Sequence, residues 1–434
     1  MTHPEGTDRS FSVEGLTRVE GEGSLHLRIR DGAVEGVALN IFEPPRYFEA
    51  LLVGRRLDEA PDITARICGI CPVAYQMSAC AAAEDLLALD PGEEIWALRR
   101  LLYCGEWIQS HALHVYLLHA PDFLGCADAV ELAERDAPLI ERGLDLKRTG
   151  NRIMEVVGGR AIHPVNVRVG GFYRSPSVEE IRSLTEPLRR ARDAAVETVA
   201  WVSSFDFPDV TRDYRFVALR RPGCYPIERG RPASSDGLDL TAAEFDRLVD
   251  EVHVERSTAL HARLRDRGPY LTGPLARYAL NSALLPPVAA EAAARAGLGP
   301  ICRNPFQSIV VRSVELLFAC EEALSLVEAY VRPPAPAVAA VPRAGSGSGV
   351  TEAPRGLLLQ TYEVEADGTI RRARIMPPTS QNQLTIEADV RSVAEASLAL
   401  DDEQLQSRCE QAVRNHDPCI SCAAHFLDMD VVRT

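Results

Sequence analysis

The sequence DPCISCAAH, residues 417–425, contains two cysteines three positions apart behind an Asp-Pro pair. A second pair with the same spacing lies in RICGIC, residues 66–71. Each pair can present two sulfurs to one metal ion, and four thiolates suit zinc, an iron–sulfur cluster or another thiophilic metal. The candidate ligands are Cys68, Cys71, Cys419 and Cys422. If they bind one centre, segments near both ends of the chain must fold against each other.

The spacing alone leaves the identity of the metal open. Zinc sites that stabilise small domains place their cysteine pairs about 12 to 20 residues apart. Here about 350 residues separate the pairs, and a chain of 434 residues can build a core without a zinc site. A structural zinc site, an iron–sulfur cluster and a catalytic metal are therefore all compatible with this pattern.

The composition is that of a soluble globular protein, with 46% apolar and 25% charged residues. The net charge of -15 makes nucleic acid and anionic membrane surfaces poor partners. No apolar run approaches the roughly 20 residues of a membrane span, and the first residues lack the pattern of a secretory signal. The odd number of cysteines, eleven, does not indicate a disulfide framework. We therefore expect a cytoplasmic protein.

The pattern of apolar residues predicts an α+β fold, mainly a helical bundle core with small antiparallel sheets from the N-terminal and C-terminal segments. Alternation on both sides of Asp31-Gly32 predicts a hairpin, and residues 356–376 predict strands around a turn at Asp367-Gly368. Helical spacing predicts helices over 95–118, 138–154, 178–202, 241–264, 306–331, 386–400 and 402–414.

The predicted domain organisation has three parts. Residues 1–331 form the N-terminal hairpin region and the helical core with the first cysteine pair. Residues 332–350 are rich in Pro, Ala, Gly and Ser, which predicts a flexible, exposed linker. Residues 351–425 form a C-terminal segment with the second cysteine pair.

The residues around both cysteine pairs, taken in order, resemble the large subunit of the nickel–iron hydrogenases. The resemblance covers nearly the whole chain, so it is far more specific than any one motif. The matching segments are LTRVEGEG (16–23), RYFEALLVGRR (46–56), SHALHVY (110–116), GGRAIHPVNVRVGG (158–171), EAPRG (352–356) and PPTSQN (377–382).

The resemblance implies that the chain catalyses the reversible oxidation of H2 to protons and electrons. It implies a nickel–iron centre whose iron carries cyanide and carbonyl ligands. Cys68 and Cys419 would be terminal nickel ligands, and Cys71 and Cys422 would bridge nickel and iron. Splitting H2 needs a Lewis-acidic metal and a neighbouring base, and cysteines that bind a metal must lose their protons.

The resemblance also assigns roles around the metals. Glu20 would pass a proton between a thiolate and the surface, although it could instead pair with Arg18 at a strand end. Arg355 would lie over the two metals, where a permanently charged guanidinium can donate in a fixed geometry; otherwise it is a solvated loop arginine. Pro378 and Thr379 would bind a cyanide ligand, although Thr379 could equally be a turn residue.

A second metal, magnesium or Fe2+, would be bound by Glu49, the carbonyl of Ile375 and His425, because a hard cation prefers oxygen ligands. The alternatives are a helix-surface charge for Glu49 and a solvent-exposed tail histidine for His425. The resemblance further implies that residues 426–434 are an extension removed by a maturation endopeptidase, and the alternative is an ordinary tail.

Three positions depart from a common family pattern, namely Glu22, Tyr75 and Ser110. They resemble the cytoplasmic, multi-subunit branch that exchanges electrons with NAD(P). The sequence has no further cysteine set for a chain of clusters and no GxGxxG dinucleotide loop. We therefore expect a small iron–sulfur subunit, NAD(P)-binding diaphorase-type subunits and a large apolar docking face. His163 would lie near the partner's closest cluster, and the alternative is a histidine whose hydrogen bonds are satisfied in the core.

Three other functions stay open from the sequence. A regulatory H2 sensor would share the same motifs. A quinone-binding subunit of a respiratory complex shares the fold but lacks the paired cysteines. A structural zinc protein would need the four thiolates and nothing else around them.

Overall fold

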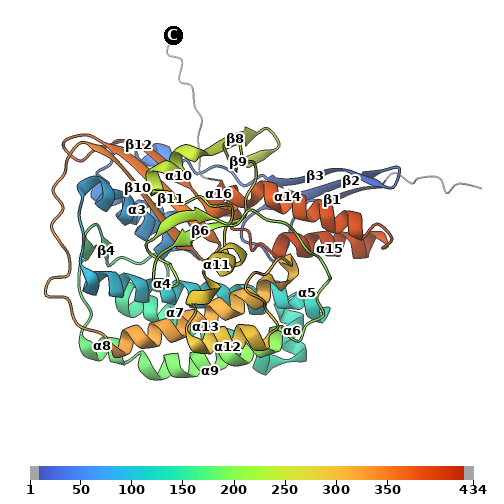
Figure 1. Cartoon of the computed structure of the whole chain (residues 1–434), viewed down its shortest axis with the longest axis horizontal. Coiled ribbons are helices and arrows are strands. Elements are labelled where there is room, and N and C mark those ends of the chain that lie inside the picture. Colours follow the sequence, from blue (N-terminus) through green and yellow to red (C-terminus); the bar gives the residue numbers. More distant parts are fainter. Residues whose placement is uncertain (1–8, 425–434) are drawn as a thin grey trace, which may run out of the picture.

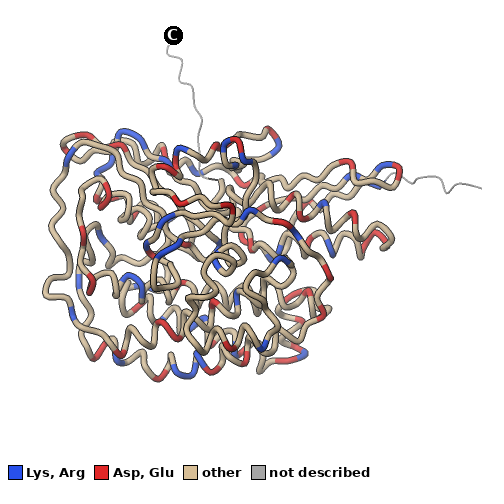
Figure 2. The backbone as a smooth tube through the Cα atoms, in the orientation of Figure 1, with Lys and Arg blue, Asp and Glu red and all other residues tan. Residues whose placement is uncertain are grey.

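The computed structural model describes residues 9–424, and four long helices form its lower layer (Figure 1). They are α4 (Glu93–Leu113), α7 (Ala137–Gly158), α9 (Thr185–Val202) and α13 (Ser308–Glu328). Helix α13 is buried along nearly its whole length, as its apolar sequence predicts, because α4 and α9 pack on it. Charged residues of both signs lie along the outer turns of this layer (Figure 2).

The backbones of helices α4 and α7 are in direct contact where the two helices cross. A Cβ atom on Gly105 would lie 2.9 Å from the Gly150 carbonyl oxygen, and one on Gly150 would lie 2.5 Å from that of Gly105. Only glycine therefore fits at this crossing. Helix α4 continues into a π-helical turn at His114–His119, so the single helix predicted over 95–118 changes its hydrogen-bond pattern near its end.

Strands β10 (Gly345–Ala353), β11 (Gly356–Val364) and β12 (Ile370–Met376) form an antiparallel sheet. Strand β10 lies directly on α3 (Pro72–Leu87): a Cβ atom on Gly349 would lie 2.4 Å from the Ala82 nitrogen. The predicted flexible linker is therefore wrong over residues 345–350, which form a strand. Their glycines permit close packing onto a helix instead of flexibility.

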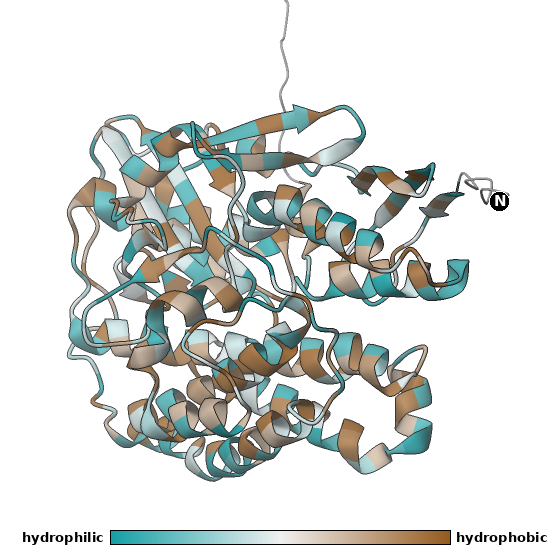
Figure 3. Cartoon of the chain, turned by 45° about the vertical axis from the view of Figure 1, so that its right-hand side comes forward, coloured by the Kyte–Doolittle hydropathy of each residue, from teal (hydrophilic) through white to brown (hydrophobic). Residues whose placement is uncertain are grey.

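The N-terminal sheet consists of β1 (Arg9–Val13), β2 (Gly23–Arg30) and β3 (Ala33–Ile41), and the predicted hairpin turn at Asp31-Gly32 is confirmed. It packs with α14 (Pro378–Ala396) and α15 (Asp402–Arg414) around a second apolar cluster. This unit projects from the body of the molecule (Figure 1). Hydrophilic residues dominate the outer end of its helix pair (Figure 3).

The helix predicted over 241–264 is wrong. The structure has a short helix, α10 (Ala242–Leu248), followed by a hairpin of β8 (Val249–Val254) and β9 (Ser257–Leu264). The apolar residues fit both periods in this region, and the β-branched valines favour the strand.

The remaining predicted helices and the turn at Asp367-Gly368 are confirmed within a few residues, with two exceptions. Residues 178–202 divide into α8 (Val178–Arg182) and α9, and the helix predicted over 386–400 begins eight residues earlier, as α14 at Pro378. The α+β fold class is confirmed. No helix in the described part of the chain is long and apolar enough to cross a membrane. The shorter elements that complete the fold are α1 (Phe48–Leu52), η1 (Leu57–Glu59), α2 (Ala60–Thr64), η2 (Ala65–Ile67), α5 (Ala120–Leu124), α6 (Ala129–Arg135), β4 (Val167–Arg168), β5 (Gly171–Phe172), β6 (Val217–Arg220), β7 (Arg231–Ser234), α11 (Pro274–Asn281), η4 (Ser282–Leu284), α12 (Pro287–Arg295), η5 (Pro305–Gln307) and α16 (Ile420–Ala423).

Candidate metal centre

The four predicted cysteines meet at one buried point. Their sulfurs all lie within 4.8 Å of one another. Cys68 follows η2 and Cys71 precedes the first turn of α3, while Cys419 directly precedes α16 and Cys422 lies within it, at the other end of the described chain. The Sγ–Sγ distances are 3.4 Å for Cys68–Cys419, 3.5 Å for Cys71–Cys422 and 2.8 Å for Cys419–Cys422.

Backbone contacts hold the two ends of the chain together at this point. Glu20 and Cys419 form a parallel bridge, in which the Ile420 N–H donates to the Glu20 carbonyl at 2.9 Å. The neighbouring Gly21 has a φ of 91°, and a Cβ atom there would lie 2.7 Å from the Ile420 Cβ. Glycine is therefore required here both by conformation and by space.

The pKa values of the clustered cysteine thiols are consistent with a cation-binding site. Hydrogen bonds from Cys419, Cys422 and Cys71 lower the pKa of Cys68 well below its ordinary value. Burial raises the pKa of Cys419 well above its ordinary value. Four adjacent thiolates in a buried site need a bound cation, because without one their charges repel and lack solvation.

Glu20 contacts the cysteine cluster directly. Its Oε2 atom accepts hydrogen bonds from the Cys419 sulfur and from the Ser421 N–H, both at 3.1 Å. Burial, and then the charge of Cys68, raise the pKa of Glu20 above its usual value. The alternative partner Arg18 forms an ion pair with Asp122 at 2.6 Å instead. The Glu20 carboxyl is therefore positioned to exchange a proton with a cluster sulfur.

Arg355 is 2% exposed, so it is not a solvated loop arginine. Its Nε atom donates to the Asp417 carbonyl at 2.8 Å and its Nη2 atom to Asp417 Oδ1 at 3.0 Å. Asp417 has a φ of 52°, which turns the chain immediately before the second cysteine pair. Nη1 has no protein partner among the described residues. A buried donor of this kind beside four sulfurs fits a site for a group with hydrogen-bond acceptors.

Pro378 and Thr379 occupy the first turn of α14, next to the second cysteine pair. The Thr379 hydroxyl accepts a hydrogen bond from the Cys419 N–H at 2.9 Å, so this side chain is more than a turn residue. The first turn of a helix presents unpaired N–H groups and the positive end of the helix dipole. Both properties suit a negatively charged ligand beside the sulfurs.

Glu49 and Ile375 also lie together. The Glu49 Oε1 atom accepts a hydrogen bond from the Ile375 N–H at 2.6 Å, and burial raises the pKa of Glu49 to about 7. Glu49 is therefore not a simple surface charge. The third predicted ligand, His425, and the predicted extension 426–434 lie outside the described residues.

A residue that the sequence analysis did not select is Glu106. This carboxylate of α4 is fully buried and accepts hydrogen bonds from the Val73 N–H at 2.6 Å and the Ala74 N–H at 3.1 Å. It therefore caps the beginning of α3, directly after Cys71. The signal available in the sequence was an acidic residue inside the otherwise apolar stretch LLYCGEWI, residues 101–108.

A buried ionic network supports the segment that carries Arg355. Arg277 forms ion pairs with Glu315 at 2.7 Å and Glu352 at 3.0 Å, and all three side chains are 0% exposed. Glu352 lies at the end of β10, three residues before Arg355. His111 lies 3.2 Å from Glu315, and burial lowers its pKa to about 4.

The fold and the site are those of a metalloenzyme whose metal is bound by cysteine thiolates from both ends of one chain. A family described as nickel-dependent hydrogenase matches residues 46–142. The alpha subunit of sulfhydrogenase 1 from Pyrococcus furiosus is 35% identical over 421 residues, covering 96% of this chain and 98% of the relative. The chain therefore belongs to the nickel-dependent hydrogenase family.

Two further relatives agree with this assignment. The beta subunit of the NAD-reducing hydrogenase HoxS from Cupriavidus necator is 27% identical, covering 96% of this chain and 95% of the relative. A crystal structure of an NAD+-reducing [NiFe]-hydrogenase superposes with a TM-score of 0.88 and 29% identity, covering 97% of this chain and all of the other. The predicted nickel–iron hydrogenase large subunit is confirmed, and the enzyme is an oxidoreductase.

Proposed function

We propose that this chain oxidises H2 reversibly to two protons and two electrons, and that NAD(P) is the final electron acceptor. The observation that carries the proposal is the buried cluster of four sulfurs with the Glu20 carboxyl 3.1 Å from the Cys419 sulfur. A metal that splits H2 needs a base in this position. A structural zinc site needs neither this carboxyl nor Arg355.

The four cysteines would bind the nickel–iron centre, with Cys68 and Cys419 on nickel alone and Cys71 and Cys422 shared with iron. When bound, this centre supplies the Lewis acid on which H2 is split. The proton that leaves the centre would bind first to the Cys419 sulfur and then to Glu20 Oε2. The raised pKa of Glu20 favours its acceptance of that proton.

The residues around Arg355 would hold the cyanide and carbonyl ligands of the iron. The free Nη1 donor of Arg355 and the first turn of α14 at Pro378 and Thr379 both offer hydrogen bonds on this side of the cluster. Asp417 fixes the guanidinium plane through two hydrogen bonds. These residues therefore position the iron ligands and keep water away from them.

A magnesium ion or Fe2+ would be bound by Glu49, the Ile375 carbonyl and His425. The short contact between Glu49 and Ile375 supports this site, because it places two of the three proposed ligands together. In the same proposal, residues 426–434 are removed by a maturation endopeptidase once the metals are in place.

The electrons would leave on the face where the first cysteine pair approaches the surface. Gly69, between Cys68 and Cys71, is exposed, and a Cβ atom there would lie 3.8 Å from Ile162. His163 binds the Ala65 carbonyl at 2.7 Å in the same region. Exposed apolar side chains lie in this segment and in the one that bonds Gly170, namely Ile162, Val165, Tyr173, Val338 and Val341.

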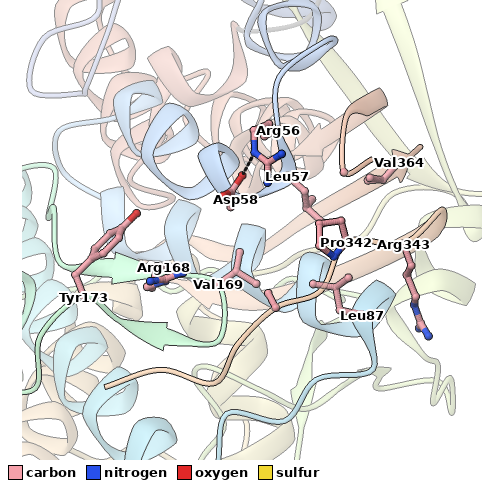
Figure 4. A pocket seen from close by; sticks show the side chains of 12 residues that line it. Arg56, Leu57, Asp58, Leu87, Arg168, Val169, Tyr173, Pro342, Arg343 and Val364 are labelled. Atoms are coloured by element: carbon pink, nitrogen blue, oxygen red, sulfur yellow. Dashed lines mark hydrogen bonds and ion pairs between the residues drawn. The ribbon is translucent and has the colours of Figure 1, made fainter. Parts of the chain in front are cut away.

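A cleft lies beside this face and is lined in part by Tyr173. Leu57, Val169 and Arg168 line it, together with Arg56, which forms an ion pair with Asp58 at 3.1 Å (Figure 4). Arg168 lies over the Tyr173 ring at 5.1 Å. We infer that an iron–sulfur small subunit with apolar and acidic side chains docks here and passes electrons to NAD(P)-binding diaphorase-type subunits in the cytoplasm. The NAD-reducing relative supports this assembly.

The decisive test is metal analysis with infrared spectroscopy of the purified complex. The proposal requires about one nickel per chain and infrared bands of bound cyanide and carbonyl. These signals should disappear in Cys422→Ala and persist in Cys409→Ala, which removes a buried cysteine outside the cluster. Zinc in place of nickel, or no cyanide and carbonyl bands, would contradict the proposal.

The docking face has its own test. Ile162→Asp, which places a charge beside the first cysteine pair, should abolish co-purification of the small subunit. Val331→Asp is the matched control, because Val331 is 67% exposed but lies just beyond α13. Equal recovery of the small subunit with both variants would place the docking face elsewhere.

A further inference from the structure

A group of buried polar side chains lies beyond the Arg355–Asp417 pair. Arg312 of α13 and Asn415 are 1% and 2% exposed, and Arg312 Nη1 donates to the Asn415 carbonyl at 2.9 Å. Within residues 9–424, the atoms Arg312 Nε, Asn415 Nδ2 and Asp417 Oδ2 have no protein hydrogen-bond partner. Buried polar atoms in native proteins bond to protein or to ordered water. We therefore expect ordered water among these side chains.

A small cavity lies at the same place. Its polar lining includes Ser308, Arg312, Asn382, Asn415 and His416. The space open to the centre of a water molecule is about 10 Å³, which is room for one water. Such a polar lining can bind a water through several hydrogen bonds, so the cavity suits a fixed water molecule.

His416 connects this cavity to a carboxylate on α14. Its Nε2 atom lies 2.9 Å from Asp389 Oδ2. Asp389 also accepts hydrogen bonds from the Tyr214 hydroxyl at 2.5 Å and from Arg212 Nε at 2.8 Å. Because Nε2 donates to the carboxylate, Nδ1 is the ring nitrogen left to accept a proton. The Arg212 side chain is 29% exposed, so the series of contacts ends at solvent.

Charged and titratable groups approach His416 from every neighbouring element. The cavity side has Arg312 from α13 and Asn415, whose Oδ1 lies 3.0 Å from His119 Nε2 of the π-helical turn, and α14 contributes Asp389. The segment before β6 contributes Arg212 and Tyr214, which contact Asp389. The chain on either side of His416 contributes Arg414 and Asp417, and these two form ion pairs with Asp122 and Arg355. His416 thus has one carboxylate that bonds it directly and a guanidinium across the cavity.

We propose that His416 is a proton-relay residue that serves the cysteine cluster by a route separate from Glu20. Water held between Arg312 and Asn415 receives a proton from the cluster side and passes one to His416 Nδ1, so the water stays neutral, while Nε2 gives its proton to Asp389 Oδ2. Asp389 releases that proton to solvent beside Arg212, so one proton enters the route and one leaves it. The proposal rests on H2 oxidation by this chain, which releases two protons in each turnover.

The test compares the complete enzyme complex with His416→Gln and His416→Gly, at rates expressed per bound nickel. Glutamine can still donate to Asp389 but cannot take up a proton. The matched control is His26→Gln on β2, whose ring bonds Ser12 and Ser24 in the N-terminal sheet. The measurements are kcat and KM for H2 oxidation across pH 6 to 9 and the solvent isotope effect on kcat.

In His416→Gln we expect kcat to fall about fivefold on the alkaline side, with an unchanged KM for H2 and a larger solvent isotope effect. Added imidazole should restore the rate of His416→Gly. The inference is wrong if the pH profile and isotope effect of His416→Gln equal those of His26→Gln, or if imidazole restores nothing. A wild-type complex without H2 oxidation would refute the proposed function instead.

Discussion

Replacement of Gly349 by alanine tests the packing of β10 on α3. In the structure a Cβ atom at this position would lie 2.4 Å from the Ala82 nitrogen and 2.5 Å from the Ser78 carbonyl oxygen. Both contacts are with helix backbone, about 1 Å closer than ordinary van der Waals contact, so no side chain can move away to relieve them. The strand itself must shift.

The expected cost is about 3 kcal/mol, at the upper end of the range for overpacked cores. For a chain of this length that corresponds to a fall of about 3 °C in the unfolding midpoint. Because β10 ends at Ala353, the same shift should displace Arg355 and lower nickel retention.

The assay is thermal unfolding of the purified chain, with nickel content measured in parallel. Gly36→Ala is the matched control, because Gly36 is also in a strand but a Cβ atom there meets nothing within 4 Å. Equal unfolding midpoints and nickel contents for the two variants would refute the packing argument.

Three other changes test the site. Cys422→Ala should abolish H2 oxidation and nickel retention, because it removes one of four sulfurs; nickel bound at the wild-type level would contradict the shared centre. Glu20→Gln should keep its nickel but slow H/D exchange about 100-fold or more; normal exchange would exclude Glu20 from the proton route. Acidification should destabilise the chain through His111 and His119, because burial lowers their pKa values to about 4 and about 3. Below pH 6.5, which is the ordinary pKa of histidine, the unfolded chain binds protons at these two positions and the folded chain does not. The free energy of unfolding is therefore highest above pH 6.5 and falls as the pH decreases. Each histidine should lower the free energy of unfolding by about 2 kcal/mol between pH 7.5 and pH 5; denaturant unfolding at both pH values measures this, and His119→Gln should show a smaller pH effect than the wild type.

The helical layer and the hairpins were predictable from local pattern. The predicted boundaries of α15 match the structure, because Asp401 caps the helix and a clear helical period follows. The failure over 241–264 has a physical cause: the same apolar residues satisfy a helical and a strand period, and packing decides between them. The linker prediction for the glycine-rich start of β10 failed for a related reason. Amino-acid composition does not reveal that this strand packs on helix α3.

The residues of the candidate site also divide into those that the sequence predicts and those that it does not. The cysteine pairs and Glu20 were predictable because their motifs lie in a specific order along the chain. Glu106 and His416 were not, because their meaning depends on partners distant in sequence. Glu106 caps α3 from another helix, and His416 reaches Asp389 on α14. The sequence marks Glu106 only as an acidic residue in an apolar stretch, and it identifies the partner of neither residue.

The contribution of donor atoms from opposite ends of the chain also fixes when the cofactor can be loaded. A ribosome-bound polypeptide contains only two of the four cluster sulfurs until residue 419 has been synthesised, and all four only once residue 422 has been added. Assembly of the bimetallic group must therefore follow translation, and a prematurely terminated product could fold much of its helical layer yet never hold the metals. Only a chain that has been synthesised as far as Cys422 can therefore bind the metal centre.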